Sequence, residues 1–245
     1  MSRHALVIGA SAGLGLALVD ELTVRGYLVS SAGRSAPARS AVVHRDIDVR
    51  HADFGAVLAG AAQPAPLSAV IFVAGDGVFG PAAATSVERA EDMFALNFWA
   101  VARCAMAAGA YFRDAGVAGA FVPVLSIAAR RAVPGEAYYG ASKAAAARFV
   151  EALAFEYPDT RFVPVYPGLM KTGFRSKVTF VGGAPSHLDA GTDPALVARA
   201  TADLVEGRRT PRVVGWRERG IDLLERIDPR IYDAVLRRRR PRGEP

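Results

Sequence analysis

Short apolar runs, each followed by a stretch with helical spacing, recur along the chain. Seven runs are expected to form buried strands: residues 5–8, 26–32, 42–43, 69–73, 120–125, 161–165 and 213–214. Four stretches have helical spacing: residues 16–24, 86–112, 139–157 and 193–207. Strands that alternate with helices predict an α/β, Rossmann-like doubly wound fold, with a seven-stranded parallel sheet and helices on both faces.

The chain is long enough to bury one large core, since it has 245 residues and 51% of them are hydrophobic. No Pro- or Ser-rich linker interrupts it, so we expect one domain over residues 1–215 and a basic, partly helical extension of it over residues 216–245. No apolar run reaches 18 residues, and the first strand pattern begins almost at once, which argues against a spanning helix or a signal peptide. We therefore expect a cytoplasmic protein.

The net charge of +6 comes entirely from the C-terminal part. Residues 1–207 carry 18 Lys and Arg against 18 Asp and Glu, whereas residues 208–245 carry 12 Arg against 6 acids. A charge confined to one end is typical of a solvated tail and does not predict a nucleic-acid partner; contact with an anionic membrane surface is the alternative. Cys104 and the four histidines show no metal-ligand spacing, so no metal site is expected.

A glycine-rich turn joins the first strand to the first helix. Gly9, Gly13 and Gly15 lie in the sequence GASAGLG, directly after the first apolar run. Glycines let the backbone approach a pyrophosphate closely, and a helix N-terminus offers free N–H groups and a favourable dipole. The turn therefore predicts a dinucleotide site, to which we also assign Ser11 and Leu14.

The end of the second strand indicates which dinucleotide binds. An acid there binds the adenosine ribose hydroxyls, whereas a basic residue accommodates a 2′-phosphate. Residues 32–35 contain no acid and include Arg34, so we expect NADP(H) in preference to NAD(H). Asp48 and Val49, which follow the third strand, are expected to flank the adenine.

Tyr139 and Lys143 form the candidate catalytic pair. Four residues apart on a helix, they share one face, so the ammonium can lie close to the phenol. A free phenol titrates near pH ~10, and a neighbouring cation lowers its pKa toward the neutral range.

Two more polar residues are candidates for the catalytic site. Ser126 ends the fifth strand, at the sheet edge where ligands of open α/β sheets bind, and Asn97 lies inside a helix, where its amide needs a hydrogen-bonding reason.

From residue 5 to residue 215 the chain resembles the single-domain type of the short-chain dehydrogenase/reductase family. The glycines at 9, 13 and 15 fit the family's Gly-x-x-x-Gly-x-Gly turn, and Ser126 precedes Tyr139 by the usual spacing. The other matching positions are Ala74 and Gly75 (end of Asn-Asn-Ala-Gly), Asn97 (helix asparagine), Tyr139 and Lys143, and Pro167, Gly168 and Thr172 (Pro-Gly-x-x-x-Thr).

Two departures from the family pattern affect the strands and not the catalytic positions. Ile8 stands where the family usually has threonine, and Phe72 and Val73 stand where it usually has two asparagines. Those polar residues brace the central strands, so their absence puts local detail in doubt.

The resemblance implies an NADP(H)-dependent carbonyl reductase or alcohol dehydrogenase, which transfers a hydride between nicotinamide and a ketone or alcohol. Tyr139 would exchange the proton, with its pKa lowered by Lys143, and Ser126 would hydrogen-bond the carbonyl oxygen. Asn97 would hold a water that links Lys143 to solvent.

The remaining cofactor contacts are also implied by the resemblance. Lys143 would hold the nicotinamide ribose together with Tyr139, and Thr172, with the backbone near Leu169, would fix the nicotinamide carboxamide. Ala74 and Gly75 would lie near a ribose, and Pro167 and Gly168 would form the turn beside the nicotinamide.

Two alternatives stay open. A non-catalytic NADP(H)-binding sensor or scaffold would keep the fold, although such relatives usually lack the tyrosine or the lysine. The other alternative is epimerisation or dehydration of a nucleotide sugar, although relatives of that kind usually have a larger C-terminal domain.

The sequence does not identify the substrate or the physiological direction of the reaction. Apolar residues in 173–192, a stretch expected to form a mobile loop, favour a carbonyl or alcohol compound with little charge.

The resemblance further implies a homodimer or homotetramer that pairs the helices of Asn97 and Tyr139 between subunits.

The C-terminal extension has apolar residues at helical spacing, then four consecutive arginines: Ile221, Leu224, Ile227, Ile231, Val235 and residues 237–240. This pattern suggests an amphipathic helix that covers the cleft or a subunit interface; resting on an anionic membrane is the alternative.

Overall fold

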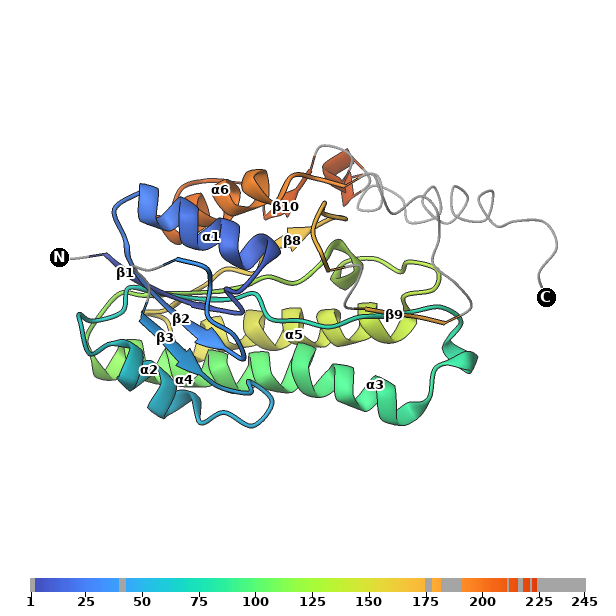
Figure 1. Cartoon of the computed structure of the whole chain (residues 1–245), viewed down its shortest axis with the longest axis horizontal. Helices are drawn as coiled ribbons and strands as arrows, with labels where there is room; N and C mark the ends of the chain where they lie inside the picture. The colour runs from blue at the N-terminus through green and yellow to red at the C-terminus, as the bar shows by residue number, and fades with distance from the viewer. Residues whose placement is uncertain are drawn as a thin grey trace.

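The computed structural model describes residues 3–39, 43–174, 178–181, 191–210, 212–215, 218–220 and 222–223 (Figure 1). Its centre is a six-stranded parallel sheet in the order β3-β2-β1-β4-β6-β7. The strands are β1 (His4–Ile8), β2 (Leu28–Gly33), β3 (Val43–Asp46), β4 (Ala69–Phe72), β6 (Ala120–Pro123) and β7 (Arg161–Phe162). The chain reverses its direction of travel across the sheet between β1 and β4, which is where open α/β sheets bind ligands.

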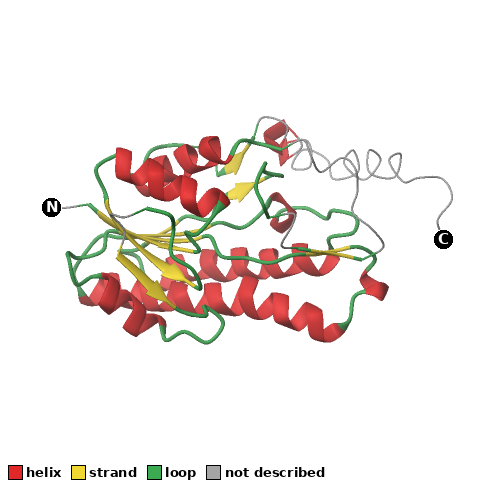
Figure 2. Ribbon diagram, viewed as in Figure 1, coloured by secondary structure: helices red, strands yellow, loops and turns green. Residues whose placement is uncertain are grey.

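Helices cover both faces of this sheet (Figures 1 and 2). α1 (Gly13–Val24) and α6 (Pro194–Val205) lie on one face, and α2 (Phe54–Ala61), α4 (Val101–Asp114) and α5 (Ala137–Glu156) lie on the other. Successive side chains of a strand point to opposite faces, so Val7 packs with α1 and α6 while Leu6 and Ile8 pack with α2, α4 and α5. Burial on both faces explains the uninterrupted apolar runs and confirms the α/β, Rossmann-like prediction.

The predicted seventh strand is a short pair beyond β7 and not a member of the six-stranded sheet. β10 (Val213–Val214) pairs in parallel with β8 (Tyr166–Pro167). The sixth strand extends past Phe162, because the N–H groups of Val163 and Val165 donate to the carbonyls of Phe121 and Pro123. Prolines at 123, 164 and 167 have no N–H to donate, which shortens the regular ladders here. The number of strands in the sheet is therefore corrected from seven to six.

Residues 87–114 form one continuous helical stretch of three segments. α3 (Val87–Phe94) leads into a π-helical segment, η2 (Ala95–Ala100), and then into α4. Ser86 begins α3 as its N-cap, since its Oγ accepts a hydrogen bond from Arg89 N–H. Within the part of the chain that the structure describes, this is the one stretch long and apolar enough to cross a membrane by length and composition alone. Half of its apolar window is buried inside the protein, as in a core helix.

Short elements lie near the carboxyl ends of the strands. β5 (Val78–Phe79) pairs in parallel with β9 (Thr179–Phe180), and two 3₁₀ turns, η1 (Ala82–Ala84) and η3 (Ile127–Ala129), follow β5 and β6. The β5–β9 pair ties residues 178–181, within the loop that follows β8, to the segment that follows β4.

The described part of the C-terminal extension docks on the main body. Asp222 Oδ1 lies 2.6 Å from Arg130 Nε in an ion pair, and Arg219 Nε donates to the carbonyl of Val213 (3.0 Å). Val42 of the third predicted strand lies outside the described residues, as does most of the predicted C-terminal helix: Ile221, Leu224, Ile227, Ile231, Val235 and residues 237–240.

Candidate active site

The four predicted catalytic residues come together at the carboxyl ends of the central strands. Asn97 is fully buried in η2, Ser126 follows β6, and Tyr139 and Lys143 lie one turn apart on α5. The Ser126 side chain lies near enough to the Tyr139 phenol to lower its pKa, and Lys143 Nζ lies 5.9 Å from the centre of the Tyr139 ring. The order of elements thus assembles a hydroxyl, a phenol and an ammonium from segments far apart in sequence.

Gly75 allows the groups beneath it to approach. A methyl group on its Cα would lie 3.1 Å from Lys143 Nζ and 3.3 Å from Asn97 Oδ1. Asn97 Nδ2 donates to Ser142 Oγ (3.1 Å), and that hydroxyl donates to the carbonyl of Tyr139 (2.7 Å). The π-helical segment is therefore tied directly to the catalytic turn of α5. Segments of π-helix within α-helices often occur at functional sites, and this one places Asn97 beside Lys143.

Burial decides the proton affinities of the catalytic pair. It raises the pKa of Tyr139 well above the usual range of a phenol, and the charge of Glu136 adds to that rise, against a lowering by the hydrogen bond from Ser126. It lowers the pKa of Lys143 to about 8, against an opposing effect from Asp76. The expected lowering of the Tyr139 pKa by Lys143 is thus not seen in the protein alone: desolvation raises the pKa of the phenol, and Lys143 is not among the groups that lower it.

The glycine turn leaves an open cradle at the start of α1. Gly9 (φ +89°) lies so close to Ala74 that a side-chain methyl would sit 2.7 Å from its nitrogen. Gly13 (φ +55°) faces Thr172, whose Cβ would be 3.3 Å from such a methyl. No side chain caps α1 at Ala12, so the first N–H groups of the helix remain available to an anion. These features fit a dinucleotide pyrophosphate. Ser11, exposed in the turn, and Leu14, buried in the first turn of α1, keep their predicted assignments untested.

The region predicted for the adenosine end has one free cation and one occupied acid. Arg34 is exposed just after β2, and among the described residues its guanidinium has no hydrogen bond or ion pair. Asp48, in contrast, accepts from Arg50 Nε (3.1 Å) and Nη2 (2.9 Å), which lowers its pKa to about 2. Val49 has its side chain in the core. Its contact with an adenine would therefore involve its backbone, and the Asp48 carboxylate is already held by Arg50.

The turn after β8 lies across from the glycine turn. Pro167 belongs to β8, and Leu169 is bonded through its carbonyl to Thr192 N–H (2.8 Å). Thr172 faces Gly13, and its Oγ1 accepts from Phe174 N–H (3.3 Å). Gly168 has no space for a side chain, because the carboxylate of Glu218 fills that position. The predicted Pro-Gly-x-x-x-Thr element therefore adjoins the same cradle as Gly13.

An apolar wall lies on one side of Tyr139. The ring of Phe79 meets the Tyr139 ring edge-on with centroids 5.2 Å apart, and Phe180 lies 5.6 Å from Phe79. Val78, Met93 and Ala128 are buried against Tyr139, with Phe79, Val133, Tyr138, Phe174 and Val181 packed around them. In the described residues of the loop after β8 (173–174, 178–181 and 191–192), Phe174 and Val181 belong to this cluster. The apolar character expected of that loop is found here at the site.

Asp76 is the site residue that the sequence did not reveal. It directly follows Gly75, and its main chain bonds Asn97 in both directions, with Asp76 N–H to Asn97 Oδ1 (3.0 Å) and Asn97 Nδ2 to the Asp76 carbonyl (2.9 Å). Its carboxylate forms an ion pair with Arg89 of α3 (2.5 Å). The Asp76-Gly77 pair is typical of a turn, and only the fold brings Asp76 near enough for its charge to act on Lys143.

Known proteins share this fold and part of this sequence. The family model described as short chain dehydrogenase matches residues 3–180. An uncharacterized oxidoreductase of Myxococcus xanthus (strain DK1622) is 31% identical over 185 residues, or 69% of this chain and 73% of that protein. A short chain dehydrogenase from Burkholderia cenocepacia J2315, solved in complex with NADP, matches with a TM-score of 0.80 at 27% identity over 98% of each chain. A short-chain dehydrogenase from Streptomyces avermitilis, at 22% identity, has a TM-score of 0.81 over 96% of this chain and 95% of that one.

Proposed function

The chain belongs to the short-chain dehydrogenase family, and from this premise we propose that it is an NADP(H)-dependent oxidoreductase acting on a ketone or its alcohol. The observation that carries the proposal is the convergence of Asn97, Ser126, Tyr139 and Lys143 beneath an apolar wall, next to an uncapped helix N-terminus. When bound, the dinucleotide supplies or accepts the hydride.

Residues of this chain are available at the pyrophosphate and at the adenosine 2′-position of the proposed cofactor. The free N–H groups at the start of α1 would bind the pyrophosphate, and Arg34 would bind the 2′-phosphate that distinguishes NADP(H) from NAD(H). Thr172, which the resemblance assigns to the nicotinamide carboxamide, faces Gly13 across the cradle and therefore adjoins the same site. The Burkholderia cenocepacia relative was solved with NADP, which supports the same choice here.

Tyr139 would act as proton donor to the developing alkoxide. Its raised pKa keeps the phenol protonated at neutral pH, which suits the reductive direction. Ser126 would hold the carbonyl oxygen through a hydrogen bond that strengthens as negative charge develops there. Lys143, half charged near pH 8, would favour loss of the Tyr139 proton when its ammonium form is present.

The apolar wall would select the substrate. The wall consists of apolar side chains that pack around Tyr139, among them Val78, Met93, Phe79, Phe174 and Val181. A ketone with an apolar body would leave water on entering, whereas a charged one would lose its hydration without a partner. Small, uncharged ketones and their alcohols are therefore the proposed substrate class.

We test the function by titrating the purified protein with NADPH and NADH, followed by fluorescence, and then adding a panel of ketones while the absorbance of reduced cofactor is recorded. Tight NADPH binding with oxidation by at least one ketone is expected. Tight binding without turnover across a broad panel would favour the cofactor-binding sensor or scaffold. No binding of either dinucleotide would contradict the proposal.

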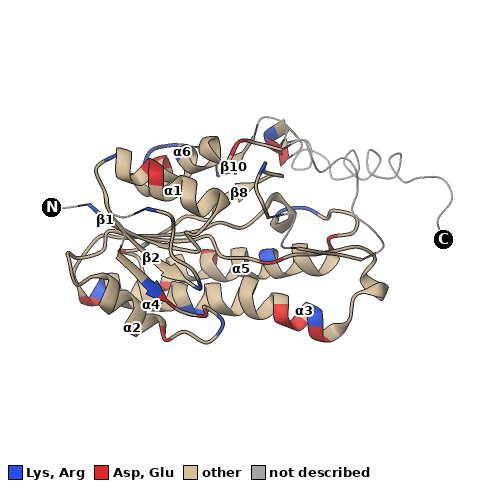
Figure 3. Cartoon of the chain, in the orientation of Figure 1, with Lys and Arg blue, Asp and Glu red and all other residues tan. Residues whose placement is uncertain are grey.

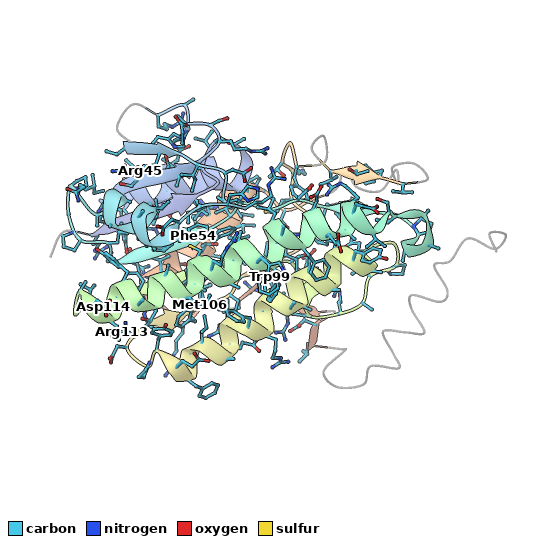
Figure 4. The ribbon with its side chains drawn as sticks, turned by 90° about the horizontal axis from the view of Figure 1, so that it is seen from below. Arg45, Phe54, Trp99, Met106, Arg113 and Asp114 are labelled. Atoms are coloured by element: carbon cyan, nitrogen blue, oxygen red, sulfur yellow. The ribbon has the colours of Figure 1, made fainter. Side chains whose placement is uncertain are left out.

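The second part of the proposal is a homodimer or homotetramer that uses the outer face of α4 and α5. These helices run side by side, and Met106 of α4 and Trp99 of the adjoining η2 lie on this face (Figure 4). Trp99, in η2 just before α4, is 58% exposed and Met106 is 42% exposed, while charged residues are also present on both helices (Figure 3). An exposed tryptophan together with an exposed methionine favours a protein partner, and a second copy of the chain satisfies it by symmetry.

A further inference from the structure

Asp76 occupies the junction of three segments of the site. It lies between β4 and β5, bonds Asn97 of η2 through both main-chain groups, and reaches α3 through its carboxylate. Asp76 Oδ1 also accepts from the N–H of Gly77 (2.7 Å), while Oδ2 lies 2.5 Å from Arg89 Nη2. Both carboxylate oxygens are thus oriented by fixed donors, and the side chain cannot turn freely.

The charges around Asp76 are few. Arg89 on α3 contacts it, Lys143 on α5 lies on the other side of Gly75, and Arg50, after β3, interacts with it at longer range. Among the described residues, Lys143 has no carboxylate within 4 Å of its Nζ, and Asp76 is the acid whose charge acts on it. A buried ammonium without a close counter-ion loses its proton readily, so a single nearby negative charge decides whether it stays charged.

We propose that Asp76 is a positioning residue of the active site, whose main chain holds Asn97 in the π-helical segment and whose carboxylate, oriented by Arg89, keeps Lys143 in its ammonium form. The proposal rests on the function proposed above, because it assigns the chemical use of that ammonium. It adds a residue to the site that neither the family motifs nor the sequence pattern singles out.

The Asp76 charge would change the protonation of Lys143 in the pH range in which the enzyme would work. Burial lowers the pKa of Lys143 to about 8, so the lysine changes charge close to neutral pH and a modest electrostatic change shifts its protonation. Arg89 works in the opposite direction, since it neutralises part of the Asp76 charge. Loss of Asp76 should therefore lower the Lys143 pKa further, and loss of Arg89 should raise it.

The direct test is the titration of Lys143 by NMR, which needs no substrate. The chain has three lysines, Lys143, Lys171 and Lys177, so selective ¹³Cε labelling gives three signals, and a Lys143→Met variant assigns the one of interest. In Asp76→Asn the Lys143 titration should move down by about half to one pH unit, because Asn keeps the shape and removes the charge. In Arg89→Gln it should move up.

The matched control removes another acid that is paired with an arginine, away from the site. Asp114 is such an acid, because its exposed carboxylate pairs with Arg113 at the end of α4. Asp114→Asn should leave the Lys143 titration unchanged. An unchanged or raised Lys143 pKa in Asp76→Asn would overturn the proposal. If Asp76→Asn does not fold, the sign of the shift in Arg89→Gln decides instead.

Kinetics give the second readout. In the reductive direction the loss of kcat at alkaline pH should begin at lower pH in Asp76→Asn than in wild type. The shift should equal the shift of the Lys143 titration measured by NMR. Asp114→Asn should keep the pH profile of the wild type. A uniform loss of kcat with an unmoved pH profile would show a merely structural role and contradict the proposal. Absence of turnover in every variant, wild type included, would contradict the proposed function, whereas the NMR result would still decide the role of Asp76.

Discussion

At the scale of single residues, the site is governed by the cost of burying charge. Tyr139 and Lys143 are 8% and 3% exposed, and burial pushes both toward their neutral forms, a protonated phenol and an amine with a pKa of about 8. The phenol is thus protonated at neutral pH, as its proposed role as proton donor requires, while the lysine depends on its surroundings to stay charged. Ser126 and Asp76 supply the opposing interactions, so four side chains set one proton-transfer equilibrium.

Arg34 is predicted to set the cofactor preference. Arg34→Ala should weaken NADPH binding about tenfold or more and leave NADH binding nearly unchanged, because a hydrogen bond to a charged group contributes roughly 1.5–3 kcal/mol. Calorimetric titration with both dinucleotides measures this. Arg39→Ala is the matched control, since its guanidinium is already paired with Asp20. Equal weakening of NADPH and NADH in Arg34→Ala would show that Arg34 does not read the 2′-phosphate.

At the scale of elements, the strand and helix order could be predicted because burial on both faces leaves long apolar runs between helical patterns. α2 could not be predicted, since its sequence FGAVLAGA has two glycines and no polar face. Only its N-cap, Asp53, which accepts a hydrogen bond from Ala56 N–H, indicates a helix there. The π-helical segment around Asn97 also escaped prediction, because its extra residue does not disturb the apolar spacing enough to be seen. Residues 213–214 could be predicted as a strand, but their pairing with β8 outside the main sheet depends on tertiary hydrogen bonds that no local pattern encodes.

The same limits apply to the candidate site. Glycines, Ser126, Tyr139 and Lys143 carry their chemistry in residue type and spacing, so they could be assigned from the sequence. Asp76 could not, since an Asp-Gly pair after a strand is typical of an ordinary turn. The direction of the Tyr139 pKa shift could be seen only in the structure. Desolvation depends on what surrounds the ring and not on which residue lies four positions away.

The start of α5 is predicted to be a source of pH-dependent instability. Burial raises the pKa of Glu136 to about 7, against a lowering by Arg131, so the folded protein binds a proton that the unfolded chain has lost between about pH 4.5 and pH 7. Wild-type stability therefore falls as pH rises through this window. Glu136→Gln should raise the free energy of unfolding at pH 8 by up to about 3 kcal/mol, at about 1.4 kcal/mol per pH unit, and by much less at pH 5.

Urea unfolding at both pH values measures the effect. Glu156→Gln, an exposed glutamate at the other end of α5, is the control and should change stability little at either pH. If Glu136→Gln is no more stable than wild type at pH 8, the Glu136 carboxyl is not desolvated as described.

At the scale of the whole molecule, the two helical layers differ in what they leave exposed. α1 and α6 are joined by a charged cluster in which Arg25 pairs with Glu21, Asp203 and Glu206. The opposite layer presents the long helices α4 and α5, whose exposed residues include Met106, Arg103 and Arg113, with Trp99 exposed in the adjoining η2 (Figure 4). Since α5 also carries Tyr139 and Lys143, a partner on this face would rigidify the helix that holds the catalytic pair.

Trp99→Glu is predicted to convert the assembly to monomers. A buried interface tryptophan often contributes about 2 kcal/mol or more, and a carboxylate in its place would have to be desolvated. Sedimentation velocity should show wild-type protein at a multiple of 25.8 kDa and the variant at 25.8 kDa. Val24→Glu, exposed on α1 at the other layer, should keep the wild-type state. A wild-type protein that sediments as a monomer would contradict the interface.

Proton donation by Tyr139 in NADPH-dependent reduction is tested by comparing Tyr139→Phe with Tyr138→Phe. Each variant loses one phenolic hydroxyl within the same apolar cluster, and the Ser126 side chain acts on the Tyr139 phenol. With the best ketone of the panel, Tyr139→Phe should lower kcat roughly 10²–10⁴-fold while NADPH binds nearly as in wild type, and Tyr138→Phe should keep most of the activity. Near-normal turnover in Tyr139→Phe would contradict the account.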